Sequence, residues 1–255
     1  MIAQGALLLV VGLAAAALAP PARAAGFITR RGATLWDGAK AYRAAGVNAY
    51  WLGLDENVGG VHFPTKFRIA GGLATVAGWL GPGATVRSQT LGVSTGGALS
   101  FEPRLNVFND TNLWAADWAI AEAERLGLRL IVPLTDNGKH FAGGKRDFCA
   151  WCGLPDLRDD DPLFYTNECV VAAFKAYVQR RLNHVNPFTG RAAKDEPSIA
   201  VWETGNELNA TAAWTGSIAA FIKTIDSNHL VMDGTYGVRP SHLGLDDVDV
   251  YTDHY

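Results

Sequence analysis

The sequence is poor in the residues that metal and redox sites require. It contains 3 Cys and 6 His among its 255 residues. Cys149 and Cys152 form a Cys-x-x-Cys pair, but no second pair and no His at ligand spacing accompany it, which disfavours a zinc site. We therefore predict no metal and no cofactor. The cysteines suit an oxidising compartment, in which Cys149, Cys152 and Cys169 would form one disulfide of undetermined pairing.

The sequence also lacks basic runs and phosphate-binding loops. Its formal net charge is −3, with both signs interspersed. This balance provides no basic face for nucleic acid and no polybasic segment for anionic lipid. No Gly-rich fingerprint follows the first predicted strand, and Gly71-Gly72 falls inside a predicted helix, so a nucleotide-binding fold is disfavoured.

The first 24 residues differ in kind from the rest. Residues 7–18 are apolar, Pro20-Pro21 interrupts them, and Ala22-Arg23-Ala24 has the small-x-small form of a signal-peptidase site. The apolar run is shorter than the ~20 residues of a spanning helix. We predict that residues 1–24 are a secretory signal and that the protein is secreted and extracellular. A membrane anchor is the alternative, because no Lys or Arg precedes the run.

The remaining chain, residues 25–255, alternates strand and helix patterns without a linker. The pattern predicts an N-terminal β-hairpin, then one α/β domain of the (β/α) barrel type rather than a Rossmann sheet. Long loops are expected at 89–111 and 138–165. The strands are predicted at 41–50, 84–88, 128–134, 199–202, 230–232 and 248–252, and the helices at 67–80, 112–126, from Thr166 to just before Pro187, and at 214–225.

Polar and aromatic residues follow several of these strands. Asn206 and Glu207 come after the buried strand 199–202, where barrel enzymes build their sites. The other candidates at strand ends are Tyr50, Trp51, Arg87, Asn137 and His254. Plainer interpretations exist, since a Glu after a strand is usually a solvated loop residue and a Tyr or Trp is as often part of the core.

Taken together, these motifs resemble the endo-β-1,4-mannanases of glycoside hydrolase family 5, from about residue 27 onward. The resemblance implies a TIM barrel that cleaves β-mannan or a related plant or algal polysaccharide with retention, through two glutamates. The motifs are Asn48-Ala49-Tyr50-Trp51, Phe63-Pro64-Thr65-Lys66-Phe67-Arg68, Val86-Arg87-Ser88, Val107-Phe108-Asn109-Asp110-Thr111, Leu134-Thr135-Asp136-Asn137, His184-Val185-Asn186-Pro187-Phe188-Thr189-Gly190 and Trp202-Glu203-Thr204-Gly205-Asn206-Glu207-Leu208.

The resemblance also implies roles for single residues. Glu207 matches the acid/base glutamate, and Asn206 the residue that holds the 2-hydroxyl of the sugar at the scissile bond. Arg87 matches an arginine that orients the nucleophile, although an ordinary ion pair at the barrel rim is the alternative. His254 matches the first member of a His-x-Tyr pair. Tyr50, Trp51 and Asn137 are expected to contact substrate.

One departure from the family pattern concerns the nucleophile. The resemblance implies a nucleophile at the end of a seventh strand, and only about six βα units are recognisable. We therefore expect a C-terminally truncated barrel that is inactive as this chain. No other carboxylate replaces the nucleophile convincingly, because retention requires the two carboxyl groups ~5–5.5 Å apart. The residues considered and set aside are Glu203, Asp253, Asp55, Glu56 and Asp136, the last three as distant on the rim or uncertainly placed.

Two other functions stay open at this point. Asn-Glu does not choose between mannose and glucose, so a β-1,4-glucanase of the same family is one alternative. A mannan-binding protein without catalysis, using Tyr50, Trp51 and Arg87, is the other. Neither alternative requires nucleic acid, nor a membrane once the signal is removed.

Overall fold

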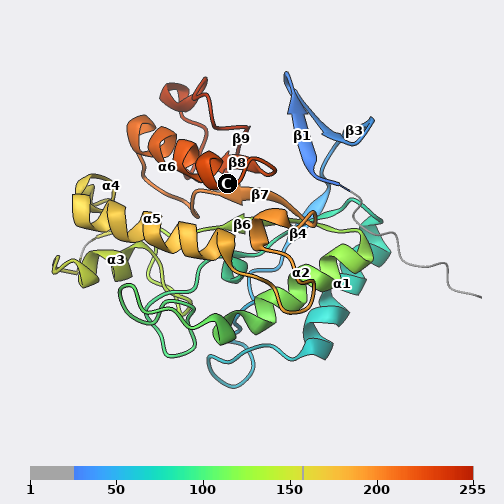
Figure 1. The fold of residues 1–255 in the computed structure, drawn as a ribbon, viewed down its shortest axis with the longest axis horizontal. Helices are drawn as coiled ribbons and strands as arrows, with labels where there is room; N and C mark the ends of the chain where they lie inside the picture. The colour runs from blue at the N-terminus through green and yellow to red at the C-terminus, as the bar shows by residue number, and fades with distance from the viewer. Residues whose placement is uncertain (1–25, 157, 255) are drawn as a thin grey trace, which may run out of the picture.

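The fold is a curved parallel sheet with helices on its outer side (Figure 1). The structure, a computed structural model, describes residues 26–156 and 158–254; the predicted signal at 1–24 lies outside this range. The sheet follows chain order, β4-β5-β6-β7-β8-β9. Its strands are β4 Gly46–Asn48, β5 Thr85–Arg87, β6 Arg129–Pro133, β7 Ile199–Glu203, β8 Leu230–Asp233 and β9 Val250–Tyr251.

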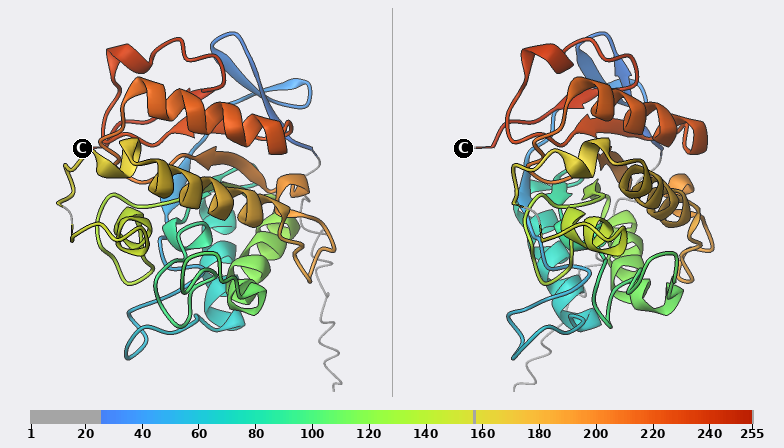
Figure 2. Two further views of the ribbon diagram at one scale, coloured as in Figure 1. Left: turned by 60° about the vertical axis from the view of Figure 1, so that its left-hand side comes forward. Right: turned by 90° about the vertical axis from the view of Figure 1, so that its left-hand side faces the viewer.

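Helices lie between these strands along the chain and cover the outer face of the sheet (Figures 1 and 2). None of the helices in the described ranges is both long and apolar enough to cross a bilayer. The α-helices are α1 Lys66–Leu80, α2 Trp114–Leu126, α3 Lys145–Trp151, α4 Leu163–Thr166, α5 Glu168–Asn183 and α6 Ala212–Ile225, and the 3₁₀ helices are η1 Gln89–Leu91, η2 Asp110–Leu113, η3 Ala193–Asp195 and η4 Pro240–His242.

Alternating strands and helices wound in this order confirm the predicted partial TIM barrel. Two helix ends explain how the sequence sets the boundaries. The side chain of Asn167, rather than Thr166, caps α5 by accepting from the Val170 N–H at 3.2 Å. Gly127 ends α2 with a φ of 70°, a left-handed conformation that glycine adopts without strain.

The N-terminal antiparallel sheet has one strand more than the predicted hairpin. It comprises β1 Ile28–Arg31, β2 Thr34–Asp37 and β3 Lys40–Tyr42. Gly32 and Gly38 both have positive φ, so each supplies a two-residue turn, and two turns make three strands. The strand predicted over 41–50 is therefore two strands: β3 ends at Tyr42, and β4, the first strand of the large sheet, begins at Gly46.

The core has an outer and an inner part. The outer part lies between the strands and the helices and contains residues such as Val132, Trp202 and Ile218. The inner part joins Val201 and Met232 of the parallel sheet to Ile28 of β1. The small antiparallel sheet therefore packs against the large one.

The predicted loop 138–165 is more structured than expected, because it contains α3 and α4. A disulfide joins Cys152 to Cys169, at the start of α5, and Cys149 is a buried free thiol. The sequence had left this pairing undetermined. Burial raises the pKa of the Cys149 thiol to about 11, which keeps it in the unreactive protonated form.

Candidate active site

The carboxyl ends of β6 and β7 bring the candidate residues together. Pro133 lies opposite Glu203 in the register, and a further bridge pairs Asp136 with Asn206. The Asn206 N–H donates to the Thr135 carbonyl at 2.8 Å. Beyond the regular strands, backbone hydrogen bonds therefore keep the two chain segments side by side.

The segment after β7 also lies close to the end of β8. The Leu208 N–H donates to the Gly234 carbonyl at 2.8 Å, and the Gly234 N–H donates to the Thr204 hydroxyl at 3.0 Å. A Cβ on Gly234 would overlap the backbone of Gly205. Only glycine allows this approach, and it places Asn206 and Glu207 between the ends of β6 and β8.

Arg87, at the end of β5, is bound to two residues of this segment. Its Nε and one terminal nitrogen donate to the two oxygens of Glu203 at 2.8 and 2.9 Å. The same nitrogen donates to Asn206 Oδ1 at 2.8 Å. Glu203 is fully buried, and burial raises its pKa despite the facing guanidinium. Arg87 therefore binds a buried carboxylate and orients the amide of Asn206.

Asn206 also contacts Asp136, which corrects the expectation that Asp136 is distant or uncertainly placed. Asn206 Nδ2 donates to Asp136 Oδ2 at 3.0 Å. Because neighbouring parallel strands end at the same edge, a residue after the third barrel strand lies beside one after the fourth. The Asp136 side chain is buried, 1% exposed.

Glu207 projects from a strained turn toward the last strand. Its φ of 56° is unusual for a residue other than glycine, and such strain is typical of functional sites. Its Oε1 lies 3.1 Å from His254 Nδ1, beyond the end of β9. The Glu207 side chain is 45% exposed. The structure thus brings together Glu207 and His254, two residues predicted separately, with the carboxylate accessible to solvent.

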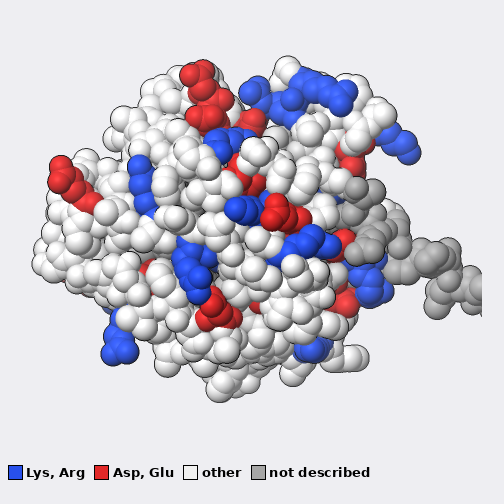
Figure 3. Space-filling view, in the orientation of Figure 1, with Lys and Arg blue, Asp and Glu red and all other residues white. Residues whose placement is uncertain are grey.

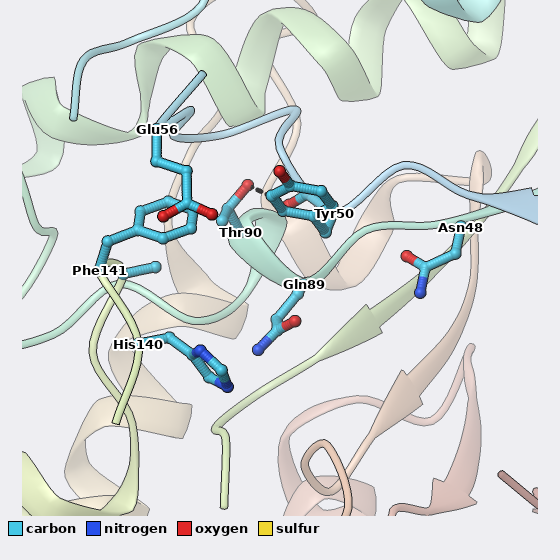
Figure 4. A pocket seen from close by; sticks show the side chains of 8 residues that line it. Asn48, Tyr50, Glu56, Gln89, Thr90, His140 and Phe141 are labelled. Carbon is cyan, nitrogen blue, oxygen red and sulfur yellow. Dashed lines mark hydrogen bonds between the residues drawn. The ribbon is translucent and has the colours of Figure 1, made fainter. Parts of the chain in front are cut away.

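A pocket of about 250 Å³ lies at the ends of β4 and β5, as Figure 4 shows. Tyr50 is one of its walls, where its hydroxyl accepts from Asn57. Phe141 contacts the Tyr50 ring edge-on, with the centroids 6.3 Å apart. The remaining walls are Asn48, Glu56, Gln89, Thr90, His140 and Ala142.

Trp51 and Asn137 are placed differently from Tyr50. The Trp51 ring packs beside Gly72 of α1 and lies 4.4 Å from the Arg68 guanidinium, so it belongs to the core alternative rather than to the pocket. Asn137 donates its backbone N–H to the Asn206 carbonyl at 3.0 Å. Its side-chain oxygen is buried and has no hydrogen-bond partner among the described residues. Neither residue lines the pocket.

Sequence reasoning missed Gln89 and His140 on this face. It also missed the role of Glu203 as the partner of Arg87. Gln89 and His140 both contact the Asp136 carboxylate. Gln89 stands two residues after Arg87, and its position beyond the end of β5 was the available signal. His140 lies in a loop without such a signal.

In residues 26–156 and 158–254, no group of three His, Cys, Asp or Glu side chains is arranged to hold a metal ion. On the face in Figure 3, positive and negative side chains are interspersed.

Comparison with known proteins points to one family. Residues 97–252 match the model of the GH family 5 beta-mannosidase-like group. A curated relative, mannan endo-1,4-beta-mannosidase 3 of Arabidopsis thaliana, is 32% identical over 227 residues, which cover 83% of this chain and 51% of that protein. Mannan endo-1,4-beta-mannosidase 4 of Oryza sativa subsp. japonica is 34% identical over 76% of this chain and 42% of its own length. The chain thus spans about half the length of these curated relatives.

Solved structures agree with the sequence comparison. The endo-1,4-beta-mannanase of Rhizomucor miehei superposes with a TM-score of 0.76 at 25% identity, over 90% of this chain and 71% of that one.

Proposed function

The chain belongs to glycoside hydrolase family 5, in the beta-mannosidase-like group, and on that premise we propose that its site serves endo-acting hydrolysis of β-1,4-mannosidic bonds in mannans and glucomannans. The observation that supports this best is the geometry around Asn206 and Glu207. Arg87 and Asp136 orient the Asn206 amide, and the next residue is an exposed glutamate. The names of the curated relatives favour mannan as the substrate.

In the proposed retaining reaction, Glu207 donates a proton to the leaving glycosidic oxygen and later takes one from water. Asn206 holds the 2-hydroxyl of the sugar at the scissile bond. His254, 3.1 Å from the Glu207 carboxylate, restrains it. Tyr50 offers an aromatic wall for a sugar ring.

The reaction also requires a second carboxylate as nucleophile, and three buried carboxylates at the carboxyl ends of β6, β7 and β8 are each bound to another side chain. Glu203 is bound to Arg87, Asp136 to Asn206, and Asp233 to His242. We therefore propose that a polypeptide of these 255 residues alone does not turn over mannan. We also propose that the protein is secreted.

The test is Glu207→Gln in the natural full-length protein. Release of reducing sugar from mannan should fall about 10²- to 10⁴-fold, the usual contribution of a general acid, while binding of mannooligosaccharide persists. Glu168→Gln, which changes an exposed glutamate at the start of α5, is the matched control and should keep the wild-type rate. An unchanged rate in Glu207→Gln would remove Glu207 from the mechanism. Faster release from cellulose than from mannan would favour a β-1,4-glucanase, and binding without turnover a mannan-binding protein.

A further inference from the structure

The amide of Asn206 lies between two opposite charges. Its oxygen accepts from the Arg87 guanidinium at 2.8 Å, and its nitrogen donates to the Asp136 carboxylate at 3.0 Å. Turning the amide over would set donor against donor and oxygen against carboxylate. One orientation is therefore strongly preferred, and it leaves the second N–H of Asn206 available to a ligand.

Asp136 is surrounded by donors. One carboxylate oxygen accepts from Gln89 and Asn206, and the other accepts from the Gly138 N–H at 2.7 Å. His140 Nε2 lies 3.3 Å from that second oxygen. These hydrogen bonds favour the ionised form, because a carboxylic acid would add an O–H among groups that already donate, whereas burial opposes ionisation. Only a neutral His140 ring can accept such a proton.

We propose that Asp136 is a positioning residue for the reaction of this site: its ionised carboxylate fixes the orientation of the Asn206 amide, and neutralising that carboxylate loosens it. Charge-assisted hydrogen bonds are roughly twice as strong as neutral ones. Protonation therefore weakens the Asn206 contact without removing any atom. This inference rests on the proposed function of Asn206, and the orientation itself can be measured without turnover.

The same carboxylate connects the site to the pocket. Gln89 and His140 line the pocket, and Figure 4 shows their polar ends lying near each other on one side of the pocket. Both side chains also contact Asp136. A sugar hydroxyl that bonds to Gln89 or His140 competes for the groups that hold Asp136. A ligand in the pocket therefore changes the contacts that orient the Asn206 amide.

The pKa of Asp136 lies in the pH range in which its carboxylate can be neutralised without extreme acid. The pKa of Asp136 is raised to about 6: burial raises it most and the negative charge of Glu207 also raises it, whereas His140, the Gly138 N–H and Asn206 lower it. Arg87, on the neighbouring strand, faces the other end of the Asn206 amide. Asp136 is thus largely ionised at pH 7 and largely neutral at pH 5.

The experiment follows the Asn206 side-chain amide by NMR in the natural full-length protein labelled with ¹⁵N-asparagine. The Asn206→Ser variant assigns the signal by its loss. In the wild type we expect the signal to titrate with a midpoint near the Asp136 pKa of about 6. In Asp136→Asn, which keeps an acceptor but no ionisable group, the signal should not change between pH 5 and 8. In His140→Gln the midpoint should move upward, because a charge that lowers the pKa is lost.

Two outcomes would overturn the proposal: a pH-independent Asn206 signal in the wild type, or a titration that survives in Asp136→Asn. A kinetic readout supports the same test. Asp136→Ala should lower kcat/KM at least tenfold, and Asp136→Asn should restore part of it while removing the acid dependence. If the NMR titration occurs and no mannan is cleaved, the proposed function fails and the positioning role of Asp136 stands.

Discussion

Two arginines on adjacent strands show how the two ends of the sheet differ. Arg129, at the start of β6, is 2% exposed and donates to the carbonyls of Gly26 and Pro197 and to Asp37. Arg87, at the end of β5, donates within the described part of the chain to the side chains of Glu203 and Asn206. One arginine ties backbone segments together, and the other holds a side-chain constellation.

The two ends of the sheet use their hydrogen-bonding groups for different purposes. At the amino end, Arg129 joins the start of the antiparallel sheet to the large sheet, which is a purely structural task. At the carboxyl end, Asn206 keeps one N–H uncommitted and Glu207 stays 45% exposed. Barrels generally carry stability at the amino end and chemistry at the carboxyl end.

The largest expected effect concerns a polypeptide of these 255 residues alone. Within the described residues, β4 and β9 each pair on one side only. Unpaired strand edges and apolar faces favour association. We expect this polypeptide to associate or to be partly ordered, and to release no reducing sugar from mannan. Light scattering and thermal unfolding measure the first property. A monomer with a sharp transition, or turnover abolished by Glu207→Gln, would contradict this prediction.

The next effect separates the two arginines in the natural full-length protein. Arg87→Met leaves Glu203 buried without its partner, which typically costs about 3–5 kcal/mol of unfolding free energy. Arg87→Met should also lower activity per folded molecule. Arg129→Met strands two carbonyls and Asp37, so it should destabilise by about 2–4 kcal/mol and leave kcat of the folded fraction unchanged.

Denaturant unfolding and kcat, measured on the same samples, check this pair. Adding Glu203→Gln to Arg87→Met provides the control, because a neutral amide does not require a cation. The double variant should recover much of the stability and little of the activity. A large loss of kcat in Arg129→Met would show that the two ends are not functionally separate.

The order of helices and strands could be predicted from the amino-acid sequence, because hydrophobic periodicity and helix caps depend on residues that are close together in the chain. The strand that precedes Asn206, the helix capped by Gly127 and the partial barrel were all recognisable. The third strand of the antiparallel sheet was missed because Gly38 was read as part of a single hairpin.

The site was predicted less completely because its contacts cross strands. The Asp136–Asn206 contact depends on the register between β6 and β7, which no local pattern specifies. Glu203, the buried partner of Arg87, had been considered only as a nucleophile and was set aside for that role on strand geometry. The pairing of Cys152 with Cys169 depends on how α3 and α5 pack, and spacing alone did not fix it.

A smaller effect concerns the disulfide, which joins the loop after β6 to α5. Cys152 and Cys169 are 17 positions apart in the sequence, and a loop of about this length contributes about 3 kcal/mol in the chain-entropy account. Cys169→Ser should lower the unfolding free energy by about that amount or less. Hydrogen exchange should increase in α3 and α5 before it increases in β1–β3. An equal increase at both ends would contradict a local role for the bond.

The smallest effect reverses the usual sign, because Asp136→Asn should stabilise the fold at neutral pH. The ordinary pKa of 3.8 applies to the unfolded chain, and the pKa in the fold is about 6. The native state therefore binds more protons between about pH 4 and 6 and loses stability as pH rises through this interval. A shift of about 2 units corresponds to at most about 3 kcal/mol, and lost hydrogen bonds reduce the gain to about 1–2 kcal/mol. Thermal unfolding should show the variant above the wild type at pH 7.5 and close to it at pH 4. Arg129→Met should show no such pH-dependent gain, because Arg129 lies at the other end of the sheet; the stability cost of ionising Asp136 would then be confined to the end where Asn206 is oriented. If Asp136→Asn is instead less stable than the wild type at pH 7.5, Asp136 serves the stability of the fold.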